Sequence, residues 1–258
     1  MNYFCVSDVH SFFKELMTAL GNVGFEKDNP EHILCVLGDM FDRGDGTVQL
    51  FEFVKELQSQ NRLIYVTGNH EDLLRDCVNE IRAGRVPSSH HFSNGTVKTI
   101  CQFCGQNEWI IYDPTWRDKI YETMQPILDF IDENCVDYYE IGDYILTHGY
   151  IPPYFIKHTE EDWNNIDKKF LWEDARWLNG MQMWKDGYRI PNKTIIVGHW
   201  HCSWGWSHIR QERKEFPNKS KKDWQKSFEP FVDDGIIALD ACCAYSGKIN
   251  CVVLGVGK

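Results

Sequence analysis

Five positions along the chain combine a short apolar run with polar side chains that are able to bind a metal ion. The candidate ligands are Asp8, His10, Asp39, Asn69, His148, His199 and His201. Carboxylate, amide and imidazole groups form a mixed nitrogen and oxygen set, which suits Mn, Fe, Zn or Co better than Ca or Mg. Seven ligands are too many for one ion, but they suit two ions about 3.5–4 Å apart that share a carboxylate. Such a pair of ions activates water and stabilises in-line displacement at phosphorus.

The apolar runs that precede these ligands have the pattern of buried strands. The runs cover residues 3–6, 33–37, 63–66, 144–146 and 195–197. Apolar residues at helical spacing lie between the first three runs, for example Phe12, Leu16 and Leu20. Alternating strands and helices predict a layered α/β fold, in which the ligand site lies beyond the carboxyl ends of the strands. We therefore expect the five polar clusters to converge on one rim.

The rest of the chain predicts further elements within a single domain of residues 1–258. We expect helices at 116–133 and 162–178, a hairpin at 138–141 and 144–146, and a final strand pair at 236–239 and 249–254. Residues 85–135 are expected to form a helical insertion that acts as a cap over the site rim. The basic residues 210–227 are expected to form a solvated polar loop, and a docking patch for an acidic partner is the alternative.

Composition limits the class of protein. The 258 residues include 27 Lys and Arg against 38 Asp and Glu, which gives a net charge of -11 and argues against broad nucleic-acid or anionic-membrane binding. The negative net charge does not exclude a small phosphorylated substrate. The apolar runs are far shorter than the roughly 20 residues of a membrane span, and the N-terminus does not resemble a signal peptide, so we expect a cytoplasmic protein. At this chain length and without an export signal, the ten cysteines predict reduced thiols. A structural zinc site is not expected, because Cys101 and Cys104 lack the second pair that it requires.

Five motifs occur in an order that resembles a known family. They are Asp8-Val9-His10, Gly38-Asp39 with Asp42-Arg43-Gly44, Gly68-Asn69-His70-Glu71, His148-Gly149 and Gly198-His199-Trp200-His201. Taken singly, Asp8 is typical of a strand-end turn, Asn69 of a helix cap and His148 of a core histidine. Together they resemble the calcineurin-like metallophosphoesterases, particularly the bacterial and phage branch of the phosphoprotein phosphatase group. The resemblance implies a two-layer β-sandwich flanked by helices and a site with two divalent ions, such as Mn, Fe or Zn.

The resemblance also implies a role for each ligand. Asp8, His10 and Asp39 would hold the first ion, and His201 would complete that site as in many metallophosphoesterases. The second ion would be held by Asp39, Asn69, His148 and His199. Asp39 would bridge the two ions. Three departures from the family pattern, Ser7, Ser11 and Tyr150 in place of glycines, leave every ligand intact.

Four further residues are implied to act on the substrate. His70 would be the general acid, Asp42 would orient it, and Arg43 would bind the phosphate oxygens through its planar fork. Arg176 resembles the position of a second phosphate-binding arginine, and an exposed helix arginine is the alternative reading.

The function that follows is a metal-dependent phosphomonoesterase, similar to serine/threonine protein phosphatases, in which a metal-bridging hydroxide attacks the phosphate ester directly. Its substrate would be a phosphoprotein or a small phosphate ester. Two alternatives remain. One is a dinucleoside polyphosphate hydrolase or phosphodiesterase that uses the same ions, and the other is a catalytically silent scaffold.

Overall fold

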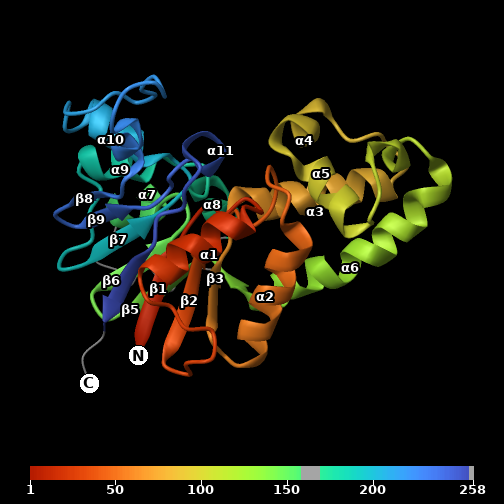
Figure 1. Ribbon diagram of the computed structural model, residues 1–258, viewed down its shortest axis with the longest axis horizontal. Helices are drawn as coiled ribbons and strands as arrows, with labels where there is room; N and C mark the ends of the chain where they lie inside the picture. Colours follow the sequence, from red (N-terminus) through yellow and green to blue (C-terminus); the bar gives the residue numbers. More distant parts are fainter. Residues whose placement is uncertain (158–168, 256–258) are drawn as a thin grey trace.

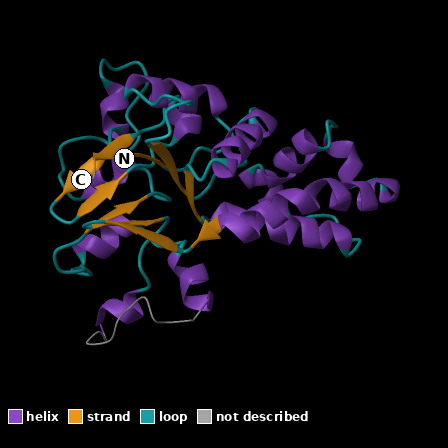
Figure 2. Ribbon diagram, turned by 90° about the horizontal axis from the view of Figure 1, so that it is seen from below, coloured by secondary structure: helices purple, strands orange, loops and turns teal. Residues whose placement is uncertain are grey.

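The structure, a computed structural model, describes residues 1–157 and 169–255. Two five-stranded sheets form the centre of the molecule, and helices flank them (Figures 1 and 2). This arrangement confirms the predicted α/β fold with two sheets flanked by helices. Each of the five apolar runs that precede a candidate ligand forms a strand.

The first sheet carries the N-terminal half of the site. Its order is β10 (Val252–Gly255), β1 (Asn2–Val6), β2 (His32–Leu37), β3 (Leu63–Val66) and β4 (Cys135–Val136). Strands β1 to β4 run parallel, and β10 is antiparallel to β1. The carboxyl ends of β1, β2 and β3 therefore meet at one edge.

The second sheet carries the other half. Its order is β5 (Tyr138–Ile141), β6 (Tyr144–Thr147), β7 (Thr194–Val197), β9 (Ile236–Ala238) and β8 (Phe231–Asp233). Strands β6, β7 and β9 are parallel, while β5 and β8 are antiparallel edge strands. The β5–β6 pair is the predicted hairpin.

The side chains of β2 alternate between the two faces of the first sheet. Cys35 and Leu37 join Leu146 and Ile196 of the second sheet in one buried cluster between the layers. Leu34 and Val36, like other alternate residues, belong to the cluster that packs under the helices. A strand buried on both faces explains why β2 is a continuous apolar run.

Three helices follow the first three strands and contribute to the core on the outer face of the first sheet. They are α1 (Phe13–Asn22), α2 (Thr47–Ser59) and α3 (Asn69–Arg82). The second sheet is accompanied by shorter helices, α7 (Pro153–Lys157), α8 (Lys169–Ala175), α9 (Gly180–Lys185), α10 (Cys202–His208) and α11 (Cys243–Ser246). The predicted helix at 162–178 is only partly testable, because residues 162–168 lie outside the described residues. In the described part of the chain, no helix has the length and apolarity needed to cross a lipid bilayer.

A helical region projects from the sheets beyond α3 (Figure 1). It comprises α4 (Ser89–Asn94), α5 (Thr96–Phe103), the 3₁₀ turns η1 (Glu108–Ile111) and η2 (Pro114–Trp116), and α6 (Arg117–Asn134). Helix α6 confirms the helix expected at 116–133. Helix α5 packs on α2 and α3 and contacts the loop that follows β2.

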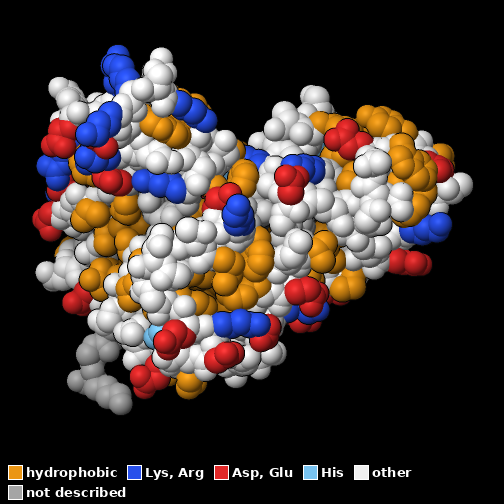
Figure 3. All heavy atoms as spheres, in the orientation of Figure 1, with side chains coloured by type: hydrophobic (Ala, Val, Ile, Leu, Met, Phe, Trp, Pro, Cys, Tyr) orange, Lys and Arg blue, Asp and Glu red, His pale blue; other side chains and the backbone are white. Residues whose placement is uncertain are grey.

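The basic stretch follows α10 and ends in the turn η4 (Trp224–Phe228). Figure 3 shows Lys and Arg side chains gathered at this end of the molecule. Part of the charge is paired, since Arg210 lies 2.8 Å from Asp233 and Arg213 lies 3.1 Å from Glu229.

The predicted pairing of the last two apolar runs is wrong. Strand β9 lies between β7 and β8 in the second sheet, whereas β10 pairs with β1 in the first. Leu239, directly after β9, and Leu254 of β10 instead share the buried cluster between the sheets. Two apolar runs bury their side chains equally well by stacking in layers or by pairing, so the sequence pattern did not separate the two arrangements.

Candidate metal centre and acid–base pair

The predicted ligands converge on the rim where the two sheets meet. Asp8 follows β1, Asp39 follows β2, Asn69 begins α3 just after β3, His148 follows β6, and His199 follows β7. The first four of these side chains are buried, and His199 is half-buried. The expected convergence of strand ends is therefore what the structure contains.

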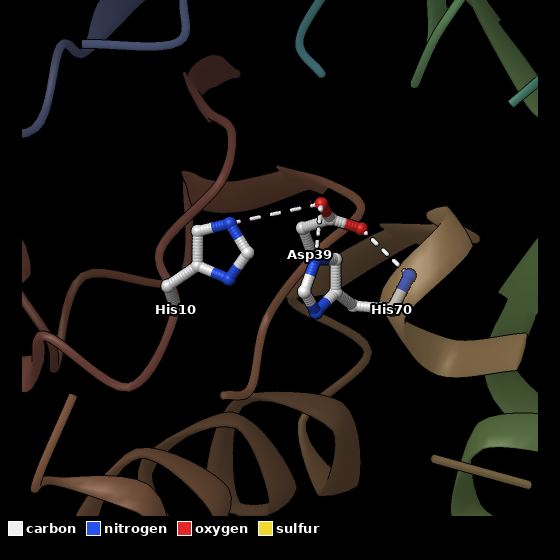
Figure 4. A group of neighbouring side chains, drawn as sticks. All are labelled: His10, Asp39 and His70. Carbon is white, nitrogen blue, oxygen red and sulfur yellow. Dashed lines mark hydrogen bonds and ion pairs between the residues drawn. The ribbon is translucent and has the colours of Figure 1, made fainter. Parts of the chain in front are cut away.

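The carboxylate of Asp39 lies between two groups of possible metal ligands. Its Oδ2 atom lies 3.7 Å from Nε2 of His10 and 3.8 Å from Nε2 of His70, as Figure 4 illustrates. Its Oδ1 atom lies 3.3 Å from Nε2 of His148, which groups it with His199. In each group of three, the possible ligand atoms all lie within 4.8 Å of one another. One carboxylate thus belongs to both groups, as a bridging ligand must.

Two histidines are oriented by backbone carbonyls. Nδ1 of His10 lies 2.9 Å from the carbonyl oxygen of Phe41, and Nδ1 of His148 lies 2.8 Å from that of Leu37. Because a carbonyl only accepts, each Nδ1 carries the proton and donates it. The Nε2 atoms then face Asp39 with lone pairs, which is the usual arrangement for a metal-binding histidine.

The chemistry of the donor set around His148 fits a cation. Nε2 of His148 lies 3.0 Å from Oδ1 of Asn69 and 3.3 Å from Oδ1 of Asp39. With the His148 proton on Nδ1, all three atoms are acceptors. Facing acceptors repel one another unless a positive charge lies among them, so these residues fit a divalent ion.

Asp8 lies close enough to Asp39 for the two charges to interact. Burial and the Asp39 carboxylate raise the pKa of Asp8 to about 8. The backbone N–H of His199 donates to both oxygens of Asp8, at 3.2 and 3.0 Å. Two carboxylates in a dry site need cations if both are to stay ionised at neutral pH.

Two histidines of the site, His10 and His199, are held in the neutral form that binds metals. Burial, followed by Arg43 and His70, lowers the pKa of His10 well below its ordinary value. Burial and the neighbouring His148 lower the pKa of His199 to about 3. For Asp39, burial acts in the opposite direction, but His148, His70 and His10 lower its pKa.

The loops that carry these residues have strained backbones. The φ angles are 51° at Asp8, 53° at Asp39 and 64° at His199, all in the left-handed region that non-glycine residues rarely adopt. Such conformations cost about 1–3 kcal/mol each and cluster at functional sites. Gly38, with φ of 74°, has a second constraint, because a Cβ atom there would lie 2.5 Å from the His148 ring.

His70 belongs to the first group and also forms a second arrangement with Asp42. Nδ1 of His70 lies 2.6 Å from Oδ2 of Asp42, and both side chains are buried. In the neutral ring, Nε2 of His70 accepts from Nη2 of Arg43 at 3.3 Å, because a guanidinium can only donate. Burial lowers the pKa of His70, but Asp39 and the hydrogen bond to Asp42 outweigh it and raise the pKa to about 9. A protonated imidazole held by a carboxylate is a proton donor aimed into the site.

Glu71 supports the ligand loops, a role that was not expected from the sequence. Its buried carboxylate accepts from the backbone N–H groups of Asp39, Met40 and Gly68 at 3.0, 2.9 and 2.7 Å. It also accepts from the hydroxyl of Tyr65 at 2.7 Å. A glutamate three residues after Gly68, at the third position of α3, matches the capping-box spacing and was the available signal.

His201 is not brought into either ligand group. Its Nδ1 lies 2.9 Å from Oγ of Ser203, and its Nε2 lies 3.5 Å from Glu215. Its ring also packs on Phe216, with centroids 4.7 Å apart. Helix α10 begins with the next residue, and the His201 side chain contacts the basic stretch through Glu215 and Phe216. The expected fourth ligand of the first ion is therefore absent from the cluster.

Arg176 is engaged elsewhere. Its Nη1 and Nη2 atoms pair with the carboxylates of Asp72 and Asp137, the latter at 2.6 Å. The side chain is 7% exposed and lines a cavity of about 510 Å³ together with Arg75, Asp132 and Cys135. None of the proposed metal ligands lines that cavity.

The three departures from the family glycines are accommodated by local packing. Ser7 and Tyr150 are buried, and the Ser11 hydroxyl lies 2.8 Å from that of Thr47. The hydroxyl of Tyr150 donates to the backbone carbonyl of Tyr188. Ser11 and Tyr150 thus have partners outside the proposed ligands, whereas the Ser7 hydroxyl lies beside Asp8 and acts to lower the pKa of that carboxyl.

Two exposed tryptophans flank His199. The ring centroid of Trp177 lies 5.8 Å from that of His199. Trp200 is the next residue after His199, and its ring centroid lies 6.4 Å from the His199 centroid. Trp177 is 52% exposed and Trp200 is 36% exposed. Large apolar rings beside a polar site offer stacking surfaces to a planar group.

A family model matches most of the chain. The model described as calcineurin-like phosphoesterase matches residues 1–237. The cold-active protein-tyrosine phosphatase of a psychrophilic Shewanella species has a similar fold, with a TM-score of 0.53 and 15% sequence identity. That match covers 98% of this chain and 75% of the phosphatase chain. At this identity the likeness establishes the fold alone.

Two curated relatives match a shorter segment. The asymmetrical bis(5'-nucleosyl)-tetraphosphatase of Anoxybacillus flavithermus is 38% identical over 80 residues, which cover 29% of this chain and 33% of the relative. The symmetrical bis(5'-nucleosyl)-tetraphosphatase of Klebsiella pneumoniae is 35% identical over 71 residues, which cover 28% of this chain and 24% of the relative. The chain thus matches only a quarter to a third of the length of these curated relatives.

Proposed function

We propose that this chain, which belongs to the calcineurin-like phosphoesterases, is a metal-dependent phosphomonoesterase that acts on phosphate esters of alcohols, such as phosphoserine in a protein. The observation that carries the proposal is the buried His70–Asp42 pair beside the Asp39 ligand groups, with Nδ1 of His70 2.6 Å from Oδ2 of Asp42. This pair provides a proton donor where a leaving oxygen would depart.

The proposed ligands divide into two sites that share Asp39, with Asp8 in place of His70, which is kept as the proton donor. Asp8, His10 and Asp39 would hold one divalent ion, and Asp39, Asn69, His148 and His199 would hold the other. When bound, the two ions supply an activated water and neutralise the phosphate oxygens. His201 is left out of this set because its ring nitrogens face Ser203 and Glu215.

Arg43 and His70 act on the two ends of the ester. The guanidinium of Arg43 carries a permanent charge and a fork of donors, and it binds the non-bridging phosphate oxygens. The imidazolium of His70 donates the proton on Nε2 to the leaving oxygen, while Asp42 holds the ring through Nδ1. After the transfer, Asp42 stabilises the ring until Nε2 takes up a proton again.

The acid–base pair favours an alcohol as the leaving group. An alkoxide is strongly basic and requires protonation as the bond breaks. A nucleotide leaves as a phosphate, whose second pKa is about 6, and it departs without a strong acid. A carboxylate-oriented histidine is therefore of most use on an alkyl monoester.

A comparison of two substrates tests the proposal. We expect faster turnover of a phosphoserine peptide than of diadenosine tetraphosphate, measured as kcat/KM with Mn²⁺, and loss of both activities with a chelator. Faster turnover of diadenosine tetraphosphate would reverse the assignment, and hydrolysis of neither substrate would favour a scaffold without activity.

A second candidate is a dinucleoside polyphosphate hydrolase, and two observations favour it. The relatives described above are named bis(5'-nucleosyl)-tetraphosphatases. The exposed rings of Trp177 and Trp200 beside His199 are suited to stack on a nucleobase. Under this candidate, Trp200→Ala raises the KM for diadenosine tetraphosphate about tenfold, since base stacking contributes about 1–3 kcal/mol. The KM for a phosphoserine peptide serves as the control and is expected to change little.

A further inference from the structure

We propose that Thr96 and Thr99 of helix α5 are positioning residues, which hold the carboxylate of Asp42 and thereby orient the His70 ring. The inference deepens the proposed function and rests on it, because the consequence for catalysis assumes that His70 is the general acid. It assigns the projecting helical region a part in the chemistry of the site.

Both oxygens of Asp42 are bound by threonine hydroxyls. Oγ1 of Thr99 donates to Oδ1 of Asp42 at 2.7 Å, and Oγ1 of Thr96 donates to Oδ2 at 2.9 Å. Since a carboxylate can only accept, the direction of both bonds is determined. Oγ1 of Thr99 also accepts from the backbone N–H of Asp42 at 3.0 Å. Thr99 therefore holds both the side chain and the backbone of Asp42, the residue that orients His70.

These contacts are sealed from water. Thr96 and Thr99 are fully buried, Asp42 is 1% exposed and His70 is 3% exposed. A buried hydroxyl directed at a buried carboxylate has no water to replace it when it is removed. Oδ2 of Asp42 accepts hydrogen bonds from both Oγ1 of Thr96 and Nδ1 of His70. If the carboxylate rotated, this oxygen would move away from the His70 ring.

Helix α5 also holds the residues of the loop that follow Asp42. Nζ of Lys98 donates to the carbonyl of Arg43 at 2.8 Å, and Nε2 of Gln102 donates to that of Gly44 at 2.9 Å. Thr96, Thr99 and Gln102 are three residues apart, which places them on one side of the helix. A Cβ atom at Gly95 would lie 2.5 Å from the backbone nitrogen of Arg43, so the helix begins against the loop itself.

The loop needs this support because its backbone is strained. The φ angles are 78° at Asp42 and 60° at Arg43, both in the left-handed region. Residues in such conformations persist only where surrounding contacts hold them. Helix α5 supplies those contacts from more than 50 residues away, since Thr96 and Asp42 are 54 positions apart.

Isosteric substitutions test the inference. Thr96→Val and Thr99→Val, singly and together, remove the hydroxyls and keep the shape, while Thr96→Ser and Thr99→Ser keep the hydroxyls. Thr115→Val is the matched control, because Thr115 also donates to an aspartate, Asp113, but is exposed and lies in η2. The readouts are kcat on a phosphoserine peptide, kcat on nitrophenyl phosphate, metal content, and the NMR resonance of the His70 Nδ1 proton, assigned by its loss in His70→Asn.

The double valine variant is expected to lose about tenfold or more of its kcat on the phosphoserine peptide, a part of the 10²–10⁴-fold typical of general acid catalysis. Its kcat on nitrophenyl phosphate is expected to change much less, because that leaving group departs unprotonated. Metal content stays the same, the Nδ1 resonance shifts, and the serine variants behave like the unaltered protein. If the double variant does not fold, the single Thr99→Val variant carries the same comparison.

Equal losses on both substrates, or an unshifted Nδ1 resonance in folded Thr99→Val protein, would overturn the inference. Failure of the proposed function is distinguishable from this result. In that case the unaltered protein does not hydrolyse the phosphoserine peptide, and the resonance alone decides whether the threonines hold the pair.

Discussion

Oδ1 of Asp39 lies 3.3 Å from Nε2 of His148, although Asp39 follows β2 of the first sheet and His148 follows β6 of the second. The candidate metal centre therefore joins the two layers of the sandwich at their rim. An ion held by both residues binds the folded state and has no preformed site in the unfolded chain.

Metal binding is accordingly expected to stabilise the fold. At a free Mn²⁺ concentration of 100 times Kd, mass action adds about 2.7 kcal/mol to the free energy of unfolding. We expect Tm to rise with Mn²⁺ and to fall with a chelator, as measured by differential scanning calorimetry. Asp39→Asn is the control, and its Tm is expected to respond much less because both ligand groups lose their shared carboxylate. If Mn²⁺ does not change the Tm of the unaltered protein, the rim holds no ion.

Removal of the general acid, His70, is expected to lower kcat by an amount that depends on the basicity of the leaving group. His70→Asn should lower kcat on a phosphoserine peptide by about 10²–10⁴-fold and on nitrophenyl phosphate far less, while both ions stay bound. Asp42→Asn should show a milder form of the same pattern, because it disturbs only the orientation of the ring. Parallel losses on the two substrates, with full metal content, would assign His70 to phosphate positioning instead.

The orientation of His201 leads to a prediction about metal affinity. His201→Ala should leave a titration with Mn²⁺ unchanged, because the ring faces Ser203 and Glu215. His199→Ala should weaken one of the two binding events, since His199 groups with Asp39 and His148. Isothermal titration calorimetry separates these outcomes. A lost binding event in His201→Ala would show that His201 is a ligand of the first ion.

Arg176 is expected to matter for stability and not for phosphate. Arg176→Met removes charged hydrogen bonds to Asp72 and Asp137 and should cost about 1.5–3 kcal/mol in the free energy of unfolding. Arg75→Met is the control in the same cavity, and its more exposed pairs with Asp72 and Asp132 should contribute about 0–1 kcal/mol. Urea denaturation measures both changes. A raised KM for phosphate esters in Arg176→Met would show that the guanidinium reaches the substrate.

The sequence was sufficient for the strands that carry ligands and for their convergence. Runs such as residues 33–37 are apolar at every position, and each is followed within three residues by a candidate ligand, which identifies a buried strand and its carboxyl end. The direction of side chains after a strand was less predictable. His199 and His201 share one motif, but only His199 falls into a ligand group, and the ring nitrogens of His201 face Ser203 and Glu215.

Contacts between residues far apart in the chain could not be predicted from the sequence pattern. Thr99 and Asp42 are 57 positions apart, and an ordinary threonine in a helix carries no sign of a buried partner. The same limit applies to the last two strands, because Leu239 and Leu254 meet across the layers and not along one sheet. Apolar character predicts burial in both cases but does not name the neighbour.

The most direct test of the account is the metal content of the purified protein together with its activity before and after metal removal. We expect two divalent ions per chain by mass spectrometry of the metals, loss of phosphoserine peptide hydrolysis after chelation, and recovery when Mn²⁺ is returned. The Asp39→Asn protein should hold fewer than two ions and recover little activity. Undiminished hydrolysis by protein shown to be free of metal would contradict the account.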